Sequence, residues 1–407
     1  MKCRHCSHTL QHVFLDLGFA PPSNAYLSVE QLKKPELYFP LKLYVCEECW
    51  LVQTEDSAQA DELFSSDYAY FSSISKGWLK HAANYSTMMI EKLSINERSL
   101  VIEVAANDGY LLKNFVANGI PCIGIEPTLS TAAAAKLLNI PIISEFFGEA
   151  LALTLANDNK QADLIIGNNV LAHVPDINDF SLGLKTVLKP MGTITLEFPH
   201  LLQLVNKNQF DTVYHEHFSY LSLFSVKKIL KLAGLRVYDV EELATHGGSL
   251  RVYACHENDL RQSSSNVDKL IQNETLGGMQ EISLYQKFQQ RADTVKNSLL
   301  NFLITQHQNG SKVAAYGAAA KGCTLLNYAG VKPDLLEYVC DAAPSKQNKF
   351  LPGSHIPIFD PKIIAEQQPD YVLILPWNIQ SEVMEQLSFI REWKGKFVVA
   401  VPELRVL

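Results

Sequence analysis

Two Cys-x-x-Cys pairs near the amino terminus constrain the fold of this chain more than any other feature. Their members are Cys3, Cys6, Cys46 and Cys49. The two-residue gap in each pair lets a tight turn aim two thiolates at one tetrahedral ion, which is typical of zinc knuckles. Four thiolates close the coordination sphere, so we predict a structural zinc. Its removal is expected to unfold residues 1 to about 60, because so small a unit depends on its metal.

A disulfide interpretation of these pairs is less favoured. The amino terminus, MKCRHCSHTL, lacks the apolar core of a signal peptide, and no run of about 18 apolar residues occurs in the chain. We therefore expect a cytoplasmic protein without a membrane partner, whose thiols stay reduced. The remaining cysteines have apolar neighbours and are expected in the core: Cys122, Cys255, Cys323 and Cys340.

Length and charge limit the classes of function. A chain of 407 residues is too long for one core, so we expect two or three domains. The apolar fraction of 47% and the charged fraction of 19% are typical of an ordinary globular protein. The formal net charge is −8 and no block of Lys or Arg occurs, which argues against a nucleic-acid partner.

Short β-rich runs alternate with helical runs between residues 99 and 200, and this rhythm predicts an α/β fold with a doubly wound parallel sheet. Two later runs, LRVYDVEEL and SLRVYACH, predict a final antiparallel pair with a glycine turn between them. The segment from 262 to 309 is a polar stretch followed by a long helical run, which we interpret as a domain connector. Ligands of such sheets lie outside the carboxyl ends of the strands.

The first strand, in VIEVAANDGYLL, carries Glu103 and ends in a turn formed by Asn107, Asp108 and Gly109. The backbone N–H groups of such a turn face a ligand. This turn alone does not separate a dinucleotide site from an adenosylmethionine site, because a single glycine of the usual pattern is present. Glu126 ends the second strand, where an acidic residue can accept hydrogen bonds from both ribose hydroxyls of an adenosyl ligand.

Two further stretches carry groups that can exchange protons. Asn168 and His173 lie in GNNVLAHVPD, at the end of the fourth strand. The second stretch, TVYHEHFSYLS, contains Tyr214, Glu216 and His217. A metal site in this stretch lacks ligands, since the HExxH pattern is absent. A polar network with a packing role is the remaining structural alternative.

The carboxyl-terminal third repeats the strand–helix rhythm and predicts a second nucleotide-binding-like sheet. The segment from Gly317 to Gly322 ends a strand and opens a helix, so its amides and Lys321 could receive a diphosphate. The alternative is that the small residues serve close helix–sheet packing. Weaker candidates for nucleotide contacts lie at other strand ends: Asp341, Lys346, Asn348, Trp377 and Asn378.

Taken together, the cysteine pairs, EVAANDGYLL, NNVLAHVPD, VYHEHFSYLS, HGGSLRVY and YGAAAKGCTLL resemble the zinc-containing sugar C-methyltransferases over essentially the whole chain. The resemblance implies a zinc-binding domain (1–75), a Rossmann-like S-adenosylmethionine (SAM) methyltransferase domain (76–285) and a second Rossmann-like domain for a nucleotide sugar (286–407). It implies a nucleotide-linked 4-keto-deoxyhexose as substrate, with dTDP as the expected nucleotide, and carbon 3 as the methylated atom. We expect a monomer.

The resemblance also assigns residues. The cofactor site maps to Asn107, Asp108, Gly109, Glu126 and Asn168, and the acid–base residues map to His173, Tyr214, Glu216 and His217. A tyrosine near the sugar maps to Tyr68, with Tyr70 as the alternative, while Lys321 and Gly322 are candidates for the nucleotide.

Carbon methylation needs an enolate, and we favour His217 as its base, with Glu216 fixing an imidazole tautomer. The alternatives are an NAD-dependent oxidoreductase, an O- or N-methyltransferase, and a zinc-bearing binding module.

Overall fold

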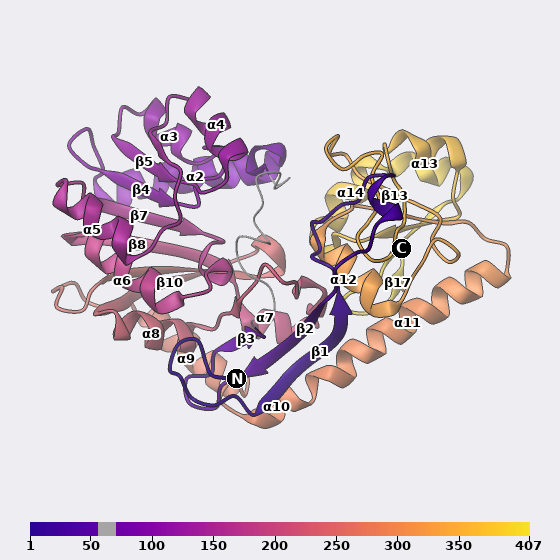
Figure 1. Cartoon of the computed structure of the whole chain (residues 1–407), viewed down its shortest axis with the longest axis horizontal. Helices are drawn as coiled ribbons and strands as arrows, with labels where there is room; N and C mark the ends of the chain where they lie inside the picture. The colour runs from indigo at the N-terminus through magenta and orange to yellow at the C-terminus, as the bar shows by residue number, and fades with distance from the viewer. Residues whose placement is uncertain (56–70) are drawn as a thin grey trace.

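The computed structural model describes residues 1–55 and 71–407 and contains three β-sheets (Figure 1). The largest sheet has seven strands in the order β10-β11-β8-β7-β4-β5-β6. Five of its strands are parallel and adjacent: β4 (Val101–Val104), β5 (Cys122–Ile125), β6 (Ile142–Ile143), β7 (Ala162–Asn168) and β8 (Leu188–Pro199). β11 (Ser249–His256) runs antiparallel to both β8 and β10 (Leu235–Leu243). The doubly wound sheet and its antiparallel pair are therefore confirmed.

Helices cover both faces of this sheet because alternate strand residues point to opposite faces. On one face, Val101 packs with α2 (Lys76–Leu93) and α3 (Leu112–Ala117). On the other face, Ile102 packs in a cluster with α5 (Glu149–Asn157), α6 (Ile177–Val187), α8 (Leu223–Leu232) and α9 (Ser265–Leu276). α4 (Leu129–Leu137) contacts the edge strand β6.

The carboxyl-terminal sheet has six strands in the order β14-β13-β12-β15-β16-β17. They are β12 (Val313–Tyr316), β13 (Val339–Cys340), β14 (Ile358–Phe359), β15 (Tyr371–Ile374), β16 (Lys396–Val399) and β17 (Arg405–Val406). The helices of this part are α12 (Ala320–Ala329), α13 (Lys362–Gln367) and α14 (Gln380–Gln386). All pairs except β16 with β17 are parallel, which confirms the second α/β sheet.

The connector between the two sheets is helical from its polar start. Ser264 caps α9 by accepting a hydrogen bond from the Asn266 amide, and α10 (Ile282–Gln286) and α11 (Phe288–Gln308) follow. The polar stretch expected from the sequence is thus the first helix of the connector. In Figure 1, α11 runs along the side of the carboxyl-terminal part.

A small four-stranded sheet joins the amino terminus to the rest of the chain. Its order is β1 (His12–Ala20), β2 (Phe39–Val45), β3 (Val52–Thr54) and β9 (Ser219–Tyr220). Phe14 of β1 stacks on Phe288 of α11, with 4.8 Å between the ring centroids. The strands of the amino-terminal unit therefore share the core of the connector and the carboxyl-terminal part.

This sharing of core changes one expectation. The strands β1 to β3 do not depend on zinc alone for their packing, contrary to the reasoning that a small unit with little core would unfold entirely without its metal. β9 immediately follows the Tyr214–His217 segment, so pairing of β9 with β3 attaches that segment to the amino-terminal sheet. None of the helices in residues 1–55 and 71–407 is long and apolar enough to span a membrane.

Candidate active site and metal centre

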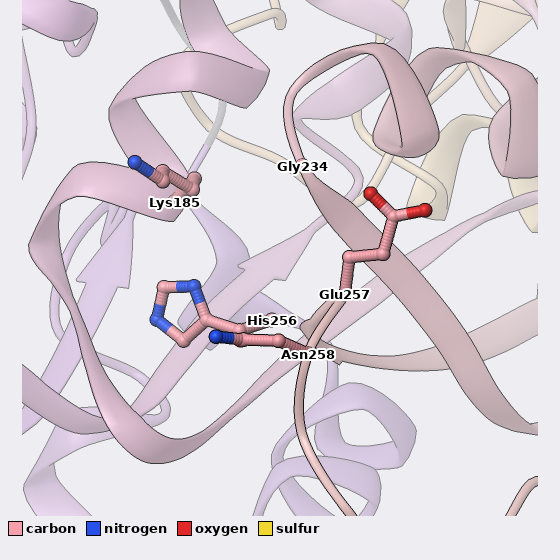
Figure 2. A pocket seen from close by; sticks show the side chains of 5 residues that line it. All are labelled: Lys185, Gly234, His256, Glu257 and Asn258. Carbon is pink, nitrogen blue, oxygen red and sulfur yellow. The ribbon is translucent and has the colours of Figure 1, made fainter.

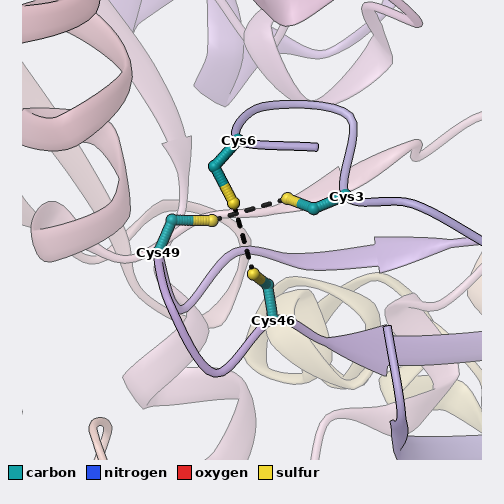
Figure 3. A group of neighbouring side chains, drawn as sticks. All are labelled: Cys3, Cys6, Cys46 and Cys49. Atoms are coloured by element: carbon teal, nitrogen blue, oxygen red, sulfur yellow. Dashed lines mark hydrogen bonds between the residues drawn. The ribbon is translucent and has the colours of Figure 1, made fainter. Parts of the chain in front are cut away.

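The four knuckle cysteines form one cluster (Figure 3). The sulfur atoms of Cys3 and Cys49 are 3.5 Å apart, as are those of Cys6 and Cys46, and all four sulfurs lie within 4.8 Å of one another. A tetrahedral zinc with Zn–S bonds near 2.3 Å separates its sulfurs by roughly 3.8 Å. The cluster thus fits zinc without rearrangement of the chain. Four thiolates fill the coordination sphere of the metal and leave no position for a substrate, so the metal is structural.

The first knuckle packs on the segment that carries His173. The Arg4 guanidinium donates a hydrogen bond to the carbonyl of Pro175 at 2.8 Å. Asn178, at the start of α6, donates to the His5 carbonyl at 2.9 Å, and its side-chain oxygen lies 2.8 Å from His5 Nδ1. The metal centre therefore supports the position of residues 173 to 178, a contact that the sequence did not indicate.

The predicted cofactor turn follows β4. Asn107 and Gly109 have φ values of 49° and 78°, in the left-handed region. A Cβ atom on Gly109 would lie 2.4 Å from Ile140 Cδ1, so glycine is required here. The Asn107 and Asp108 side chains accept hydrogen bonds from the amides of Ser72 and Ser73, which closes one side of the turn.

Glu126 lies beside this turn and is buried. Its carboxylate accepts hydrogen bonds from the amides of Asn107 and Thr128, both at 2.9 Å. The Asn168 side chain, at the end of β7, is buried with no hydrogen-bond partner for either polar atom among the described residues. One oxygen of Asp108 is also unpaired there. Such buried atoms fit a polar ligand, since unpaired buried polar groups are costly.

The acid–base candidates from separate segments meet in one cluster. The rings of His173 and His217 have centroids 4.5 Å apart, and those of Tyr214 and His217 are 4.1 Å apart. His173 belongs to η3 (Leu171–His173), which follows β7, so it lies at the same sheet edge as Asn168. The structure thus brings together three of the predicted residues from segments about forty positions apart in the sequence.

Burial keeps both imidazoles of this cluster neutral. It lowers the pKa of His173 to about 4, although Nδ1–H of this ring donates a hydrogen bond to the Glu216 carbonyl at 2.7 Å. That bond leaves Nε2 of His173 as the basic atom. Burial also lowers the pKa of His217 well below its usual range, and the neighbouring His173, His246 and Lys321 act in the same direction.

The Glu216 carboxylate does not orient an imidazole, which corrects the expectation from the sequence. It accepts hydrogen bonds from Asn24 Nδ2 at 3.0 Å and from Ser23 Oγ at 3.3 Å. Burial raises the pKa of this carboxyl. Its main-chain carbonyl holds His173 instead, because the side chain points to the amino-terminal unit. Glu216 therefore anchors the cluster to residues 23 and 24.

The carboxyl-terminal part contributes Lys321 from α12. Its Nζ donates to Asn378 Oδ1 at 2.6 Å and lies 4.6 Å from the centre of the Trp377 ring. Burial lowers the pKa of Lys321, while Asp211 raises it. The Trp377 indole N–H donates to Asp211 at 2.7 Å, which joins the two α/β parts directly.

The other candidates in this part differ in their surroundings. A Cβ atom on Gly322 would lie 2.9 Å from Leu375, so this glycine permits close packing of α12 on the sheet, as one of the two interpretations held. Lys346 donates to the Ala318 carbonyl at 2.9 Å and lies 3.6 Å from Asp341. Asn348 has a left-handed backbone. Tyr68 and Tyr70 lie outside the described residues.

Sequence reasoning missed a charged group at the end of β8. The buried Glu197 carboxylate accepts hydrogen bonds from Arg251 at 2.6 Å and lies 2.9 Å from His81 Nε2. The His81 ring stacks on Trp78 with a centroid distance of 4.8 Å. A signal existed, because the run MGTITLEFP places an acidic residue at a strand end.

A shallow surface pocket lies elsewhere. Figure 2 shows its lining residues, which are Lys185, Gly234, His256, Glu257 and Asn258. His256 pairs with Leu235 at the start of β10, and its ring lies 3.2 Å from the carbonyl of Leu188 at the start of β8. The pocket is therefore at the amino-terminal edge of the parallel strands, opposite to the acid–base cluster.

Comparisons with known proteins divide the chain into three matched regions. Residues 3–64 match a zinc binding domain, residues 80–240 a methyltransferase domain and residues 244–402 a C-methyltransferase C-terminal domain. The C-methyltransferase NovU of Streptomyces niveus is 32% identical over 406 residues, which cover 100% of this chain and 96% of NovU. The chain belongs to this C-methyltransferase family.

This C-methyltransferase uses SAM, and its cysteine cluster fits zinc. The unpaired atoms of Asn168 and Asp108 and the carboxylate of Glu126 fit the polar parts of the cofactor. Within the described residues, the four cysteines form the group that could hold a metal ion, so the metal interpretation of the Tyr214–His217 segment gains no support.

Solved structures with partial similarity include the PH0226 protein of Pyrococcus horikoshii, which is 15% identical with a TM-score of 0.39 over 46% of this chain and 94% of that one. Another is a magnesium protoporphyrin IX methyltransferase of Synechocystis with bound SAM, 14% identical with a TM-score of 0.34 over 44% of this chain and 80% of that one. Both TM-scores are below 0.5.

Proposed function

We propose that this enzyme transfers a methyl group from SAM to carbon 3 of a nucleotide-linked 4-keto-deoxyhexose, with dTDP as the expected nucleotide. The observation that carries the proposal is the cluster of His173, Tyr214 and His217, which lies between the carboxyl edge of the methyltransferase sheet and Lys321 of a second α/β part. O- or N-methyl transfer could use one base of this cluster, but it forms no enolate and would leave the second donor of the cluster without a use.

Carbon methylation requires a carbon nucleophile. A ketone supplies one when the adjacent carbon loses a proton and becomes an enolate, and SAM when bound supplies an activated methyl electrophile. If the C–H group and an imidazolium differ in acidity by on the order of ten pK units, the mismatch is roughly 14 kcal/mol. A base alone does not cover this difference, so hydrogen-bond donors must stabilise the enolate oxygen.

The residues of the cluster can share this work. We assign proton removal to His217, whose neutral imidazole lies in contact with Tyr214 and His173. The Tyr214 hydroxyl is the candidate donor to the enolate oxygen. His173 can relay or hold the proton at Nε2, because its Nδ1–H is committed to the Glu216 carbonyl.

The carboxyl-terminal part is proposed to hold the nucleotide. Lys321 is a half-buried cation at the start of α12, close to Trp377 and Asn378. A diphosphate there would replace the amide oxygen of Asn378 as its partner and compensate its desolvated charge. Tyr68 remains the candidate for a contact with the sugar.

The test uses a panel of nucleotide-linked 4-keto sugars with SAM carrying a labelled methyl group. The proposal expects a new methyl group on carbon 3 in the NMR spectrum of the product. An O- or N-methylated product, or no product with any member of the panel, would overturn it.

A second experiment tests the base. With adenosylhomocysteine in place of SAM, the wild type is expected to exchange the proton on carbon 3 with solvent deuterium, because no methyl group traps the enolate. His217→Asn should lower both exchange and methylation by on the order of 10²–10⁴-fold while both ligands still bind. Turnover of His217→Asn near that of the wild type would move the assignment to His173 or Tyr214.

A further inference from the structure

His246, in the turn between β10 and β11, is a histidine near the acid–base cluster and has no part in the steps proposed above. It belongs to η5 (Thr245–Gly247) and has a left-handed backbone with φ 54° and ψ 20°. A residue with a β-carbon adopts this conformation at a cost, and such residues concentrate at functional sites. The Trp78 ring lies 5.3 Å from the His246 ring, measured between centroids.

The turn that carries His246 is held from several sides. The Gly247 carbonyl accepts hydrogen bonds from Lys207 Nζ at 2.9 Å and from Gln209 Nε2 at 3.0 Å. A Cβ atom on Gly247 would lie 2.5 Å from the Trp377 ring, so the turn is pressed against the carboxyl-terminal part. These contacts fix the place of the His246 ring relative to both α/β parts.

The tautomer of His246 follows from its partner. The Asn169 side-chain amide donates to His246 Nε2 over 3.4 Å, so Nε2 accepts and the proton of the neutral ring is on Nδ1. The hydrogen bond of the His246 side chain within residues 1–55 and 71–407 is this one at Nε2, so Nδ1 is left for a ligand. Asn169 adjoins Asn168 of the cofactor site and also has a left-handed backbone, with φ 54°.

Contacts of the turn place His246 near Lys321 and the predicted cofactor site: Gly247 is pressed against Trp377, whose ring centre lies 4.6 Å from Lys321 Nζ, and Asn169 contacts the His246 ring. His246 contributes to the lowered pKa of His217, and Lys321 contributes to that of His246. Burial is the main cause that lowers the pKa of His246 to about 4, so the ring is neutral at pH 7. A neutral ring of this tautomer is a hydrogen-bond donor that does not compete with His217 for the substrate proton.

We propose that His246 is a further catalytic residue, which donates a hydrogen bond from Nδ1–H to the substrate oxygen that becomes negative when the enolate forms. This inference rests on the proposed function. A role as donor explains why a histidine with a fixed tautomer is held near the predicted cofactor site, His217 and Lys321. The donor complements Tyr214 at the same oxygen, as two donors commonly do in sites that stabilise an oxyanion.

The test compares three substitutions of His246. The amide nitrogen of Asn can occupy the place of Nδ1, whereas that of Gln reaches the place of Nε2. We therefore expect His246→Ala and His246→Gln to lose on the order of 10²–10³-fold in both deuterium exchange and methylation. His246→Asn should stay within about tenfold of the wild type, and all three should bind adenosylhomocysteine with unchanged affinity.

A fourth variant tests the tautomer, and a fifth is the control. Asn169→Gly removes the amide that donates to Nε2 and tolerates the left-handed backbone of this position, so the proton of the neutral ring is no longer held on Nδ1. Activity should fall although His246 is present. His256→Asn, in the surface pocket at the opposite edge of the sheet, should keep the activity of the wild type.

The outcomes separate the two proposals. Full activity of His246→Ala, equal losses in His246→Asn and His246→Gln, or full activity of Asn169→Gly would each overturn the role of His246 while leaving the proposed function intact. A wild type that methylates carbon 3 of no 4-keto sugar would overturn both.

Discussion

The substitution Asp211→Asn is expected to stabilise the protein at neutral and alkaline pH. Asp211 lies in η4 (Phe210–Thr212) and is fully buried at the contact between the two α/β parts. One carboxylate oxygen accepts from the Trp377 indole, and the other has no hydrogen-bond partner among the described residues. Asn keeps the shape and can still accept from the indole, but it carries no charge.

The magnitude follows from the pKa of this carboxyl, which burial raises from 3.8 to about 6 despite the opposing effects of Lys321 and Trp377. Between these two values the folded state binds a proton that the unfolded state does not, so stability falls as pH rises from 3.8 through 6. The difference converts to about 3 kcal/mol at 1.36 kcal/mol per pH unit. Asp211→Asn should raise the free energy of unfolding by up to about that amount at pH 8, and by progressively less toward pH 4.

The assay is urea unfolding followed by circular dichroism at pH 5, 6, 7 and 8, with Trp fluorescence to check the indole contact. Asp158→Asn, at an exposed position, is the matched control and should change stability by less than about 0.5 kcal/mol at each pH. A variant less stable than the wild type at pH 8 would refute the reasoning, because the ionised carboxylate would then stabilise the fold through Lys321.

Two further predictions concern the metal and the cofactor. Chelation of zinc, or Cys46→Ser, should increase hydrogen–deuterium exchange in residues 1–10, 45–51 and 171–178. β1 should stay protected, because it packs against α10 and α11. Uniform exchange over residues 1–55 would contradict the shared core. Glu126→Ala should weaken SAM binding by roughly 1.5–3 kcal/mol, or roughly 10- to 150-fold, without changing the affinity for the nucleotide sugar. Calorimetry with exposed Glu145→Ala as the control checks this, and equal weakening of both ligands would refute the assignment.

Much of the fold is readable from the sequence because its signals are local. Strand–helix alternation predicted both parallel sheets, and the two cysteine pairs predicted one tetrahedral metal centre. The turn at Asn107–Gly109 was recognisable since its left-handed backbone needs residues of this kind. Whole-chain resemblance to sugar C-methyltransferases named the remaining candidates, and membership of a C-methyltransferase family is now established.

Other features depend on contacts between residues distant in the chain. Glu216 meets Ser23 across 193 positions, and this contact turned its carboxylate away from the imidazoles. The knuckle contact of Arg4 with Pro175 spans 171 positions. Neither contact can be predicted from the periodicity of the sequence, because hydrophobic patterning specifies which face of an element is buried and not which element covers it.

The sequence by itself therefore determined the local elements: the metal-binding loops, the strands of the two α/β sheets and the left-handed turn at Asn107–Gly109. Only the tertiary structure decided that His173 and His217 are neutral, that Glu216 is an anchor, and that His246 lies beside the cluster. The physical reason is that protonation, tautomer and hydrogen-bond partner depend on desolvation and on neighbours in space, and packing of distant segments sets both.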